Sequence, residues 1–212
     1  MSIEQMIANL AETYADKLNQ QVQKRVEDMK NDDKSHYLLY QVLKVTVEEG
    51  ELIDIYQNKG RFLYKYAGSF LEEAALLCFE HKFGENALKK VKIPNTIGQR
   101  PKTFEIDCLV DNNAYEIKWR DATTDGDHIT KEHTRIQVIK NAGFVPIRIM
   151  FYYPNREQAI KIQKTLETLY KGVNGYYYYG DSAWQYIKDT TDVNLKQILE
   201  RIAEENTKKG GK

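Results

Sequence analysis

Apolar residues recur every three or four positions through residues 2–29, which predicts one long amphipathic helix. Ser2 and Gln5 have the spacing of a capping box at its start. The polar cluster at residues 31–34 predicts the end of this helix, and Ser35 can cap the next one. The apolar positions of the first helix are Ile3, Ile7, Leu10, Tyr14, Leu18, Val22 and Val26.

The pattern stays helical up to Gly84. Residues 37–56 are apolar but less regular, with Gly50 as a possible interruption, and Asn58-Lys59-Gly60 predicts a turn. Residues 61–83 then have a strong helical stripe, and Gly84 is suited to cap its C-terminus.

Two short alternating segments follow, at residues 104–110 and 114–119, and they predict a β-hairpin. A two-residue turn at Asn112-Asn113 would place Asp107 opposite Lys118, with Glu116 on the same face. One face then carries the apolar residues Phe104, Ile106, Cys108, Val110, Tyr115, Ile117 and Trp119, and the other carries Glu105, Asp107, Glu116, Lys118 and Arg120.

The rest of the chain alternates between helix and strand. The expected elements are a helix at 128–142, a buried strand at 145–152, a helix that opens at Pro154-Asn155 with Gln158 in its cap and closes at Gly172, a Gly- and Tyr-rich loop at 173–180, and a helical region at 182–203. The fold class is therefore α/β, with a central mixed sheet flanked by helices. We expect a helical N-terminal extension at 1–60, a core with C-terminal helices at 61–205, and a frayed tail at 206–212.

Composition narrows the class of protein. The chain has 212 residues, 31 basic and 31 acidic, and 42% hydrophobic residues, which excludes a disordered chain and a protein that coats nucleic acid non-specifically. Apolar runs are too short for a membrane span, so no membrane partner is expected. With only Cys78 and Cys108, a disulfide framework is not expected, and a reducing cytoplasm is the expected compartment.

One segment has a strongly basic character. Residues 86–103 contain Lys89, Lys90, Lys92, Arg100 and Lys102 and no acidic residue. Pro94, Gly98 and Pro101 predict that part of this segment is loop. Basic side chains on such a segment could hold phosphates, which position a duplex without reading its sequence.

Asp107, Glu116 and Lys118 on one face of a hairpin suggest metal chemistry. Two carboxylates so close repel each other unless one is protonated, a lysine compensates, or a divalent cation lies between them. Hard oxygen ligands with room for water and phosphate suit Mg²⁺, for which Mn²⁺ can substitute. The alternative is a surface hairpin whose charges form ordinary salt bridges.

The arrangement resembles the PD-(D/E)xK nuclease superfamily. The resemblance covers Asp107, Glu116 and Lys118, the hairpin between them, and the helix and strand that follow; Ile106 stands where the family often has proline. It implies that Asp107 and Glu116 bind the metal and that Lys118 activates or orients water. It also implies a further acid from the preceding helix. There Glu73 borders the apolar stripe, whereas Glu72 lies four residues after Gly68, a spacing typical of the family.

Two stretches, EIKWRDATTDGDHITKEHTRI and GDSAWQYIKDTTDVNLKQIL, are similar to the ApaLI-like type II restriction endonucleases. This resemblance implies a homodimer that cuts both strands of double-stranded DNA at a palindromic site. The apolar stripes of the N-terminal helices must be buried somewhere, and we expect them to contribute to the dimer interface; the alternative is that they cover one face of the sheet within a monomer.

Candidate DNA contacts follow from their position in the chain. They lie in the basic segment, just past the second hairpin strand, and in the Tyr-rich loop; they are Lys92, Arg100, Lys102, Arg120, Thr123, Thr124, His128, Thr130, Lys131, His133, Thr134, Arg135 and Asn174. His128 and His133 could equally be a solvated helix face. Tyr176 to Tyr179 could brace DNA or lie in a dimer interface.

The sequence therefore predicts a site-specific, Mg²⁺-dependent DNA endonuclease. Two other readings stay open. One is a different nuclease on the same core, such as a junction resolvase or a transposon end-cleaving subunit. The other is a non-catalytic DNA-binding module that keeps the hairpin.

Overall fold

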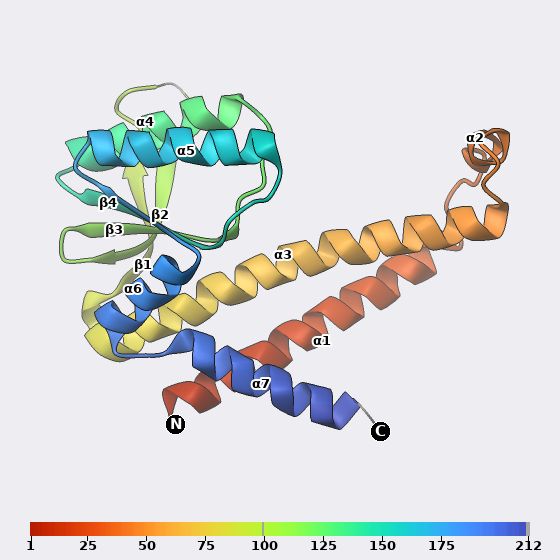
Figure 1. The fold of residues 1–212 in the computed structure, drawn as a ribbon, viewed down its shortest axis with the longest axis horizontal. Coiled ribbons are helices and arrows are strands. Elements are labelled where there is room, and N and C mark those ends of the chain that lie inside the picture. The colour runs from red at the N-terminus through yellow and green to blue at the C-terminus, as the bar shows by residue number, and fades with distance from the viewer. Residues whose placement is uncertain (99, 211–212) are drawn as a thin grey trace. The chain divides into compact units, whose positions relative to one another are not determined.

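The computed structural model describes residues 1–98 and 100–210 (Figure 1). In chain order the elements are α1 (Ile3–Met29), α2 (Tyr37–Val42), α3 (Val47–Phe83), the 3₁₀ turn η1 (Gly84–Asn86), β1 (Leu88–Pro94), β2 (Thr103–Val110), β3 (Asn113–Arg120), α4 (Asp127–Asn141), β4 (Val145–Tyr152), α5 (Glu157–Gly172), β5 (Tyr176–Tyr179), α6 (Asp181–Thr191) and α7 (Leu195–Gly210). The chain divides into two compact units. One consists of Met1–Ala8 and the chain from Leu71 onward, and the other is Asn9–Phe70.

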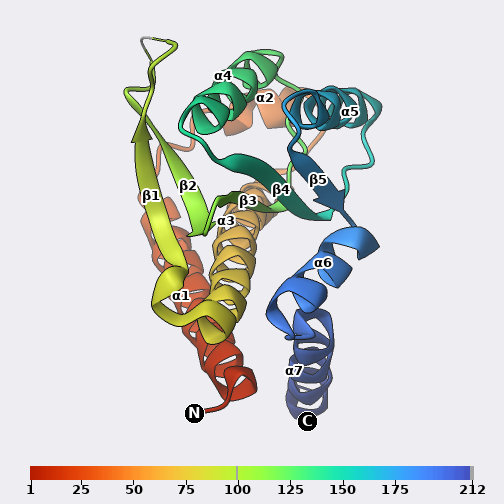
Figure 2. The ribbon, with the colours of Figure 1, turned by 90° about the vertical axis from the view of Figure 1, so that its left-hand side faces the viewer.

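The larger unit is built on a mixed five-stranded sheet in the order β1-β2-β3-β4-β5. The pairs β1/β2 and β2/β3 are antiparallel, while β3/β4 and β4/β5 are parallel. Helices α4 and α5 lie side by side over one face (Figure 2), and α6 packs on the other face through contacts such as that between Trp184 and Phe151. The predicted α/β class, with a mixed sheet flanked by helices and a helical N-terminal region, is confirmed.

The hairpin of β2 and β3 forms, but its predicted register is wrong. The turn lies at Asp111-Asn112, because Val110 pairs with Asn113 and Asp111 takes a φ of 52°. Asp tolerates this left-handed conformation much as Asn does, so the pattern of turn residues fitted either position. The register is shifted by two residues, which preserves the faces near the turn.

A second departure lies at Asp107, where regular pairing stops. The ladder with β3 ends at Cys108↔Tyr115, and on the β1 side no pair forms between Lys89↔Cys108 and Val91↔Ile106. Asp107 Oδ2 instead accepts a hydrogen bond of 2.7 Å from the backbone N–H of Ile117, so a side chain replaces the missing ladder bond. The uniform alternation expected for β2 therefore breaks at this residue.

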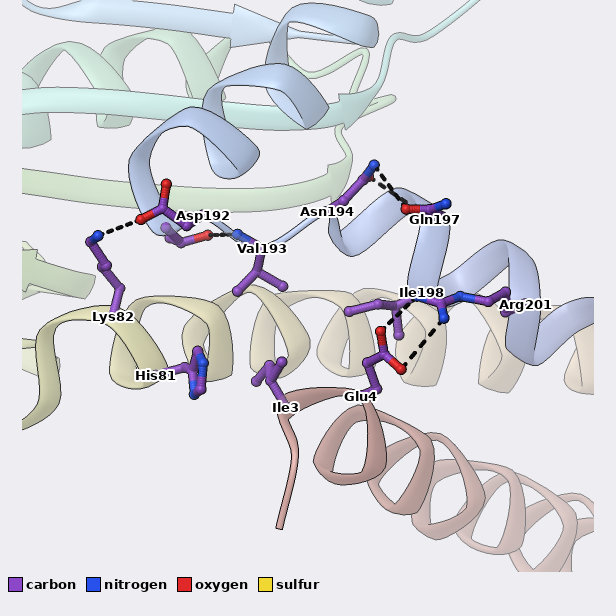
Figure 3. A pocket seen from close by; sticks show the side chains of 11 residues that line it. Ile3, Glu4, His81, Lys82, Asp192, Val193, Asn194, Gln197, Ile198 and Arg201 are labelled. Atoms are coloured by element: carbon purple, nitrogen blue, oxygen red, sulfur yellow. Dashed lines mark hydrogen bonds and ion pairs between the residues drawn. The ribbon is translucent and has the colours of Figure 1, made fainter.

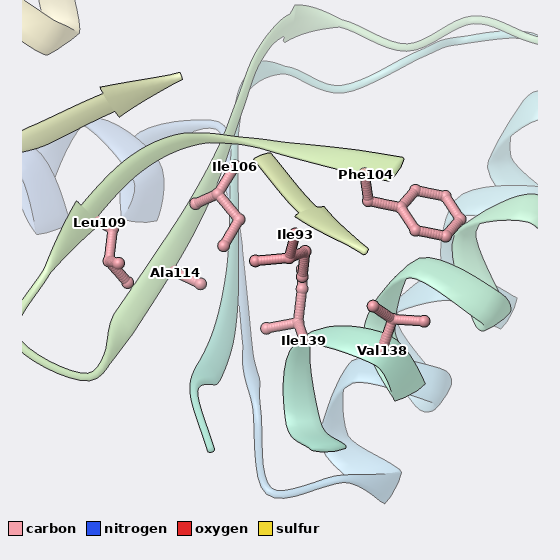
Figure 4. Packing of buried hydrophobic residues seen from close by; sticks show 7 residues of the cluster. All are labelled: Ile93, Phe104, Ile106, Leu109, Ala114, Val138 and Ile139. Atoms are coloured by element: carbon pink, nitrogen blue, oxygen red, sulfur yellow. The ribbon is translucent and has the colours of Figure 1, made fainter. Parts of the chain in front are cut away.

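The break changes which apolar residues of β2 share a face. Phe104 and Ile106 pack in one cluster with Leu109, instead of with Cys108 and Val110 as predicted (Figure 4). The cluster brings together residues of β1, β2, β3 and α4, namely Ile93, Phe104, Ile106, Leu109, Ala114, Val138 and Ile139. A second cluster joins α4 and α5 to the sheet and contains Ile136, Met150, Ile162, Leu166, Tyr170 and Tyr177. Both clusters include residues of α4, which fixes this helix over the sheet.

Two strands were not predicted from the sequence: one lies in the basic segment, only part of which was expected to be loop, and the other lies in the predicted Tyr-rich loop. Residues 88–94, in the basic segment, form edge strand β1, and residues 176–179 form β5 parallel to β4. Tyr177 is buried and donates a hydrogen bond of 2.6 Å to Gln163, which gives the tyrosine run one inward residue. Gly175 makes the approach possible, because a Cβ there would lie 2.5 Å from the carbonyl oxygen of Pro146.

Helix boundaries also differ in places. Helix α3 runs through Gly50 and through the predicted turn at residues 58–60, because a single interior glycine costs only about 1 kcal/mol within a long helical pattern. Helix α5 begins at Glu157 without a side-chain cap, since Asn155 and Gln158 bond instead to Arg120 and to the carbonyl of Thr124.

The C-terminal helical region is two helices, α6 and α7, separated at Asp192 with a φ of 59°. Helix α7 reaches Gly210, and residues 211–212 lie outside the described residues. At the other end of the chain, α1 starts as predicted, with the Ser2 hydroxyl accepting a hydrogen bond from the N–H of Gln5.

The smaller unit, Asn9–Phe70, consists of most of α1, all of α2 and the first part of α3. Tyr14 makes edge contacts with Tyr66 and Phe70, and Tyr40 donates a hydrogen bond to Asp54. Many of its large apolar side chains are nevertheless exposed, namely Leu38, Leu39, Val42, Leu43, Leu52, Ile53, Tyr56, Leu63 and Tyr64. Across the described part of the chain, no helix is both long enough and apolar enough to cross a bilayer.

Candidate active site

Strands β2 and β3 bring Asp107, Glu116 and Lys118 together. The ammonium of Lys118 lies 2.7 Å from Oε1 of Glu116 and 3.9 Å from Oδ2 of Asp107. Both carboxylates are buried, at 7% exposure for Asp107 and 4% for Glu116, whereas Lys118 is about one-third exposed. The site is therefore not an ordinary solvated salt-bridge surface, which was the alternative reading of the hairpin.

Glu116 has a second cationic partner from helix α4. Its Oε2 accepts a hydrogen bond from the guanidinium of Arg135. Burial by itself would raise the pKa of Glu116, but Lys118, Arg135 and Arg148 outweigh that effect and hold the pKa below its usual value. Glu116 is consequently a carboxylate anion with both oxygens engaged.

Asp107 is in the opposite electrostatic situation. Burial, together with the negative charge of Glu116, raises the pKa of Asp107 to about 7, although Lys118 acts in the other direction. Lys118, Arg135 and Arg148 all act on Glu116, whereas for Asp107 burial and the charge of Glu116 outweigh the opposing effect of Lys118. The two carboxyls therefore differ in charge near neutral pH, as expected for a close carboxylate pair.

Glu72 at the C-terminal part of α3 belongs to the same electrostatic group. Its pKa is raised, first by burial and then by Glu116, while Lys118 lowers it. The sequence argument favoured Glu73 because that residue borders the apolar stripe. The charge environment favours Glu72, whose half-buried carboxyl interacts with the hairpin residues.

Lys118 completes the group as a cation. Burial would lower its pKa, but the charges of Glu116 and Asp107 outweigh burial and raise it. A lysine that stays protonated can donate hydrogen bonds and offset negative charge, but it cannot take a proton from water.

Sequence reasoning missed a second set of charges beneath α4. Arg148 on β4 is fully buried and pairs with Asp121 at 2.6 Å and with Glu132 of α4 at 3.1 Å. In the parallel register Arg148 lies next to Glu116. The signal was present in the sequence, since Arg148 is the single charged residue within the buried strand at 145–152.

The candidate DNA contacts fall into three places. Lys92 is on edge strand β1, and Arg100 and Lys102 follow it in the adjoining loop, with all three exposed. Of the candidates in the loop after β3 and in α4, Thr124, Thr130, Lys131 and His133 are exposed, and Thr123 and Thr134 are half-buried. Asn174 precedes β5, so by the parallel register it lies near the start of β4, at the end of the sheet away from Arg120.

Three of the basic candidates already contact polar side chains of the protein. Arg120 donates a hydrogen bond to Asn155, and His128 pairs with Asp121 at 2.9 Å. Arg135 is held at Glu116 inside the charge cluster. Arg135 is thus placed to bind the carboxylate of Glu116.

A pocket of about 340 Å³ elsewhere in the larger unit is a separate feature (Figure 3). It lies between α3, α7 and the start of α1, and its charged side chains already pair with one another. Lys82 pairs with Asp192, and Arg201 pairs with Glu4 at 2.7 Å. No residue of the hairpin lines it.

The donor set at the hairpin suits a hard divalent cation. Asp107 and Glu116 offer carboxylate oxygens, and the pKa values of Asp107 and Glu72 are raised first by burial and then by the charge of Glu116, both of which a bound cation would offset. Within residues 1–98 and 100–210, no three side chains of His, Cys, Asp or Glu are grouped as a metal site. Two carboxylates fit Mg²⁺, which usually keeps waters and substrate phosphates as its remaining ligands.

A hairpin carrying Asp107, Glu116 and Lys118 in a helix-flanked mixed sheet is consistent with the PD-(D/E)xK nuclease superfamily. Residues 1–204 match the model of the ApaLI-like restriction endonuclease family. No curated protein and no solved structure matches the chain. Because the match spans nearly the whole chain, the protein belongs to the ApaLI-like restriction endonuclease family, a family of DNA-binding nucleases.

Proposed function

We propose that this protein is a Mg²⁺-dependent type II restriction endonuclease that cuts both strands of DNA at a palindromic site. The observation that carries the proposal is the buried group of Asp107 and Glu116 with Lys118 bridging them. Family membership supports the nuclease class, and the donor set supports the choice of metal.

In this proposal Asp107 and Glu116 hold the cation, for which Mn²⁺ can substitute, and Glu72 assists from α3. When bound, the metal supplies a Lewis acid that polarises the scissile phosphate and makes attacking water more acidic. The water oxygen forms a bond to phosphorus as one phosphorus–oxygen ester bond breaks; the water loses a proton to solvent, and the departing ester oxygen takes up a proton and leaves as the alcohol. Lys118 donates a hydrogen bond that orients the water and offsets charge developing on the phosphate.

The chain also offers a basic surface for the DNA backbone. The exposed side chains of Lys92, Arg100 and Lys102 follow the edge of the sheet nearest Asp107. In the proposed complex these residues bind phosphates, which set the position of the duplex, whereas residues of the loop after β3 and of α4 contact bases.

Cutting both strands of a palindrome requires two active sites, and a homodimer with two-fold symmetry supplies them. The exposed apolar side chains of Asn9–Phe70 support the proposal that a second copy of the protein covers this part of the surface. Leu38, Leu39, Val42 and Leu43 are each at least 65% exposed, which is unusual for a contiguous apolar patch on a monomer.

A digest of plasmid DNA tests the proposed activity. With Mg²⁺ the protein is expected to produce a small set of discrete fragments, and EDTA is expected to stop the reaction. Cleavage of branched DNA alone would instead identify a junction resolvase. DNA binding without any metal-dependent cutting would contradict the proposal and indicate a binding module.

A further inference from the structure

Six side chains, acidic and basic residues in turn, form a continuous network from the hairpin to the segment at residues 121–128. In order they are Glu116, Arg135, Glu132, Arg148, Asp121 and His128. The links beyond Glu116 and Arg135 measure 3.4 Å from Arg135 to Glu132, 3.1 Å from Glu132 to Arg148, 2.6 Å from Arg148 to Asp121 and 2.9 Å from Asp121 to His128.

The middle of this network of side chains is buried. Arg148 has no exposed surface and Glu132 is 2% exposed. Placing such a pair under α4 is expensive in desolvation, and apolar residues of similar size often stabilise a fold as well or better. The Nε atom of Arg148 also has no hydrogen-bond partner among the described residues, so the network is not optimised for stability.

The two ends of the network, Glu116 and His128, lie at functionally different places. At one end Arg135 holds Oε2 of Glu116, so it fixes the orientation of that carboxylate. At the other end a single oxygen of Asp121 accepts hydrogen bonds from both Arg148 and His128. His128 is only partly buried and stands in the first turn of α4, so its other surface is open to a ligand.

We propose that Glu132 and Arg148 are positioning residues that couple the segment at residues 121–128 to the carboxylate of Glu116. A contact of DNA with this segment changes the Asp121–His128 pair, and the change reaches Glu116 through Arg148, Glu132 and Arg135. Correct binding at the segment thereby sets the geometry of the carboxylate that holds the metal. This inference rests on the proposed function, because it assigns Glu116 to catalysis.

A double-mutant cycle on single-turnover DNA cleavage tests the coupling. His128→Ala is expected to slow cleavage by about tenfold in the otherwise native protein, and to have little further effect in Glu132→Gln, where the network is already cut. Glu132→Gln itself is expected to lower the cleavage rate while the Kd for DNA changes by less than about threefold. His81→Ala, a histidine of α3 outside the network, serves as the matched control with no effect in either background. Independent, multiplying effects of His128→Ala and Glu132→Gln would overturn the proposal.

A second measurement does not depend on cleavage, so it separates failure of the coupling from failure of the proposed function. NMR of the ¹⁵N-labelled histidine rings follows His128, with His81 as the reference resonance. Glu116→Gln is expected to shift the His128 ring signals in the native background and to leave them in place in Glu132→Gln. If Glu132→Gln does not fold, the double change Glu132→Met with Arg148→Met cuts the network while keeping apolar packing. His128 signals that respond equally in the native and the cut background would contradict the coupling, even if the protein cleaves DNA.

Discussion

At the residue scale, the site depends on two neighbouring carboxyls with opposite pKa shifts. Glu116 is held as an anion by Lys118 and Arg135, while burial and the charge of Glu116 raise the pKa of Asp107 to about 7. These pKa shifts follow from burial and from neighbouring charges. The alternation of the sequence could indicate only that the hairpin residues share a face. The sequence identified the three hairpin residues, but it could not reveal that Arg135 faces Glu116 or that Arg148 lies beneath α4.

The raised pKa of Asp107 predicts how stability changes with pH. An aspartate whose pKa rises from 3.8 to about 7 on folding favours the folded state while it is protonated, and this contribution is lost as pH rises through 7. Asp107→Asn is therefore expected to raise the unfolding midpoint of the metal-free protein at pH 8, with the gain shrinking toward pH 5. Thermal unfolding from pH 5 to 8 measures it. A gain that is equal at both ends of this range would contradict the assigned pKa.

The Arg135–Glu116 pair predicts a large loss of stability when its cation is removed. Arg135→Met leaves Glu116 buried with Lys118 as its remaining ion-pair partner, and breaking a buried pair typically costs about 3 kcal/mol. Urea unfolding is expected to show this loss. The matched control is Lys171→Met, which removes an exposed pair with Glu167 and is expected to cost less than about 1 kcal/mol. Equal losses in the two variants would show that burial of the pair does not matter.

At the level of helices and strands, periodic apolar patterns predicted the structure well, whereas single turn-forming residues predicted it poorly. The strand at 145–152 and the helices around it follow their apolar pattern. Strand β1 was not predicted because its lysines obscure an alternating apolar pattern, although the strand pairs with β2. Strand β5 was not predicted because the glycines on both sides of it indicated a loop. The turn at residues 58–60 was predicted from three polar or flexible residues, yet the helical pattern on both sides prevailed.

Two of the glycines in helix α3, Gly50 and Gly60, allow a direct test of this explanation. A Cβ at Gly60 would meet no atom within 4 Å, so Gly60→Ala is expected to raise the unfolding free energy by about 0.5–1 kcal/mol. A Cβ at Gly50 would lie 2.6 Å from Cδ2 of Tyr40, so Gly50→Ala is expected to destabilise. Chemical denaturation of both variants measures the difference. A loss of stability in Gly60→Ala would contradict a continuous helix through this position.

At the level of the whole molecule, the smaller unit buries few of the apolar side chains that form stripes along its helices. The expectation from the sequence was that these helices bury their apolar faces in a homodimer. Sequence periodicity predicted the helices, but it could not say what covers them, because that depends on a second surface. The exposed leucines of α2 and the start of α3 make the proposal testable.

Leu39→Asp with Leu43→Asp is expected to convert the proposed dimer into a monomer, because two charges cannot be buried in an apolar interface without large cost. Size-exclusion chromatography with light scattering measures the mass. Leu88→Asp, at an exposed leucine at the start of β1, is the matched control and is expected to stay dimeric. A double variant that remains folded and dimeric would place the interface elsewhere.

We propose that Asp107 takes part in metal-dependent cleavage. The most direct measurement is single-turnover cleavage of plasmid DNA by Asp107→Ala, with its DNA affinity and fold checked in parallel. Asp111→Asn, at the exposed hairpin turn four residues away, is the control, because Asn tolerates the positive φ there. Asp107→Ala is expected to bind DNA without cutting it, while Asp111→Asn is expected to cut at the native rate. Native cleavage by Asp107→Ala would show that this carboxyl is not needed for cleavage.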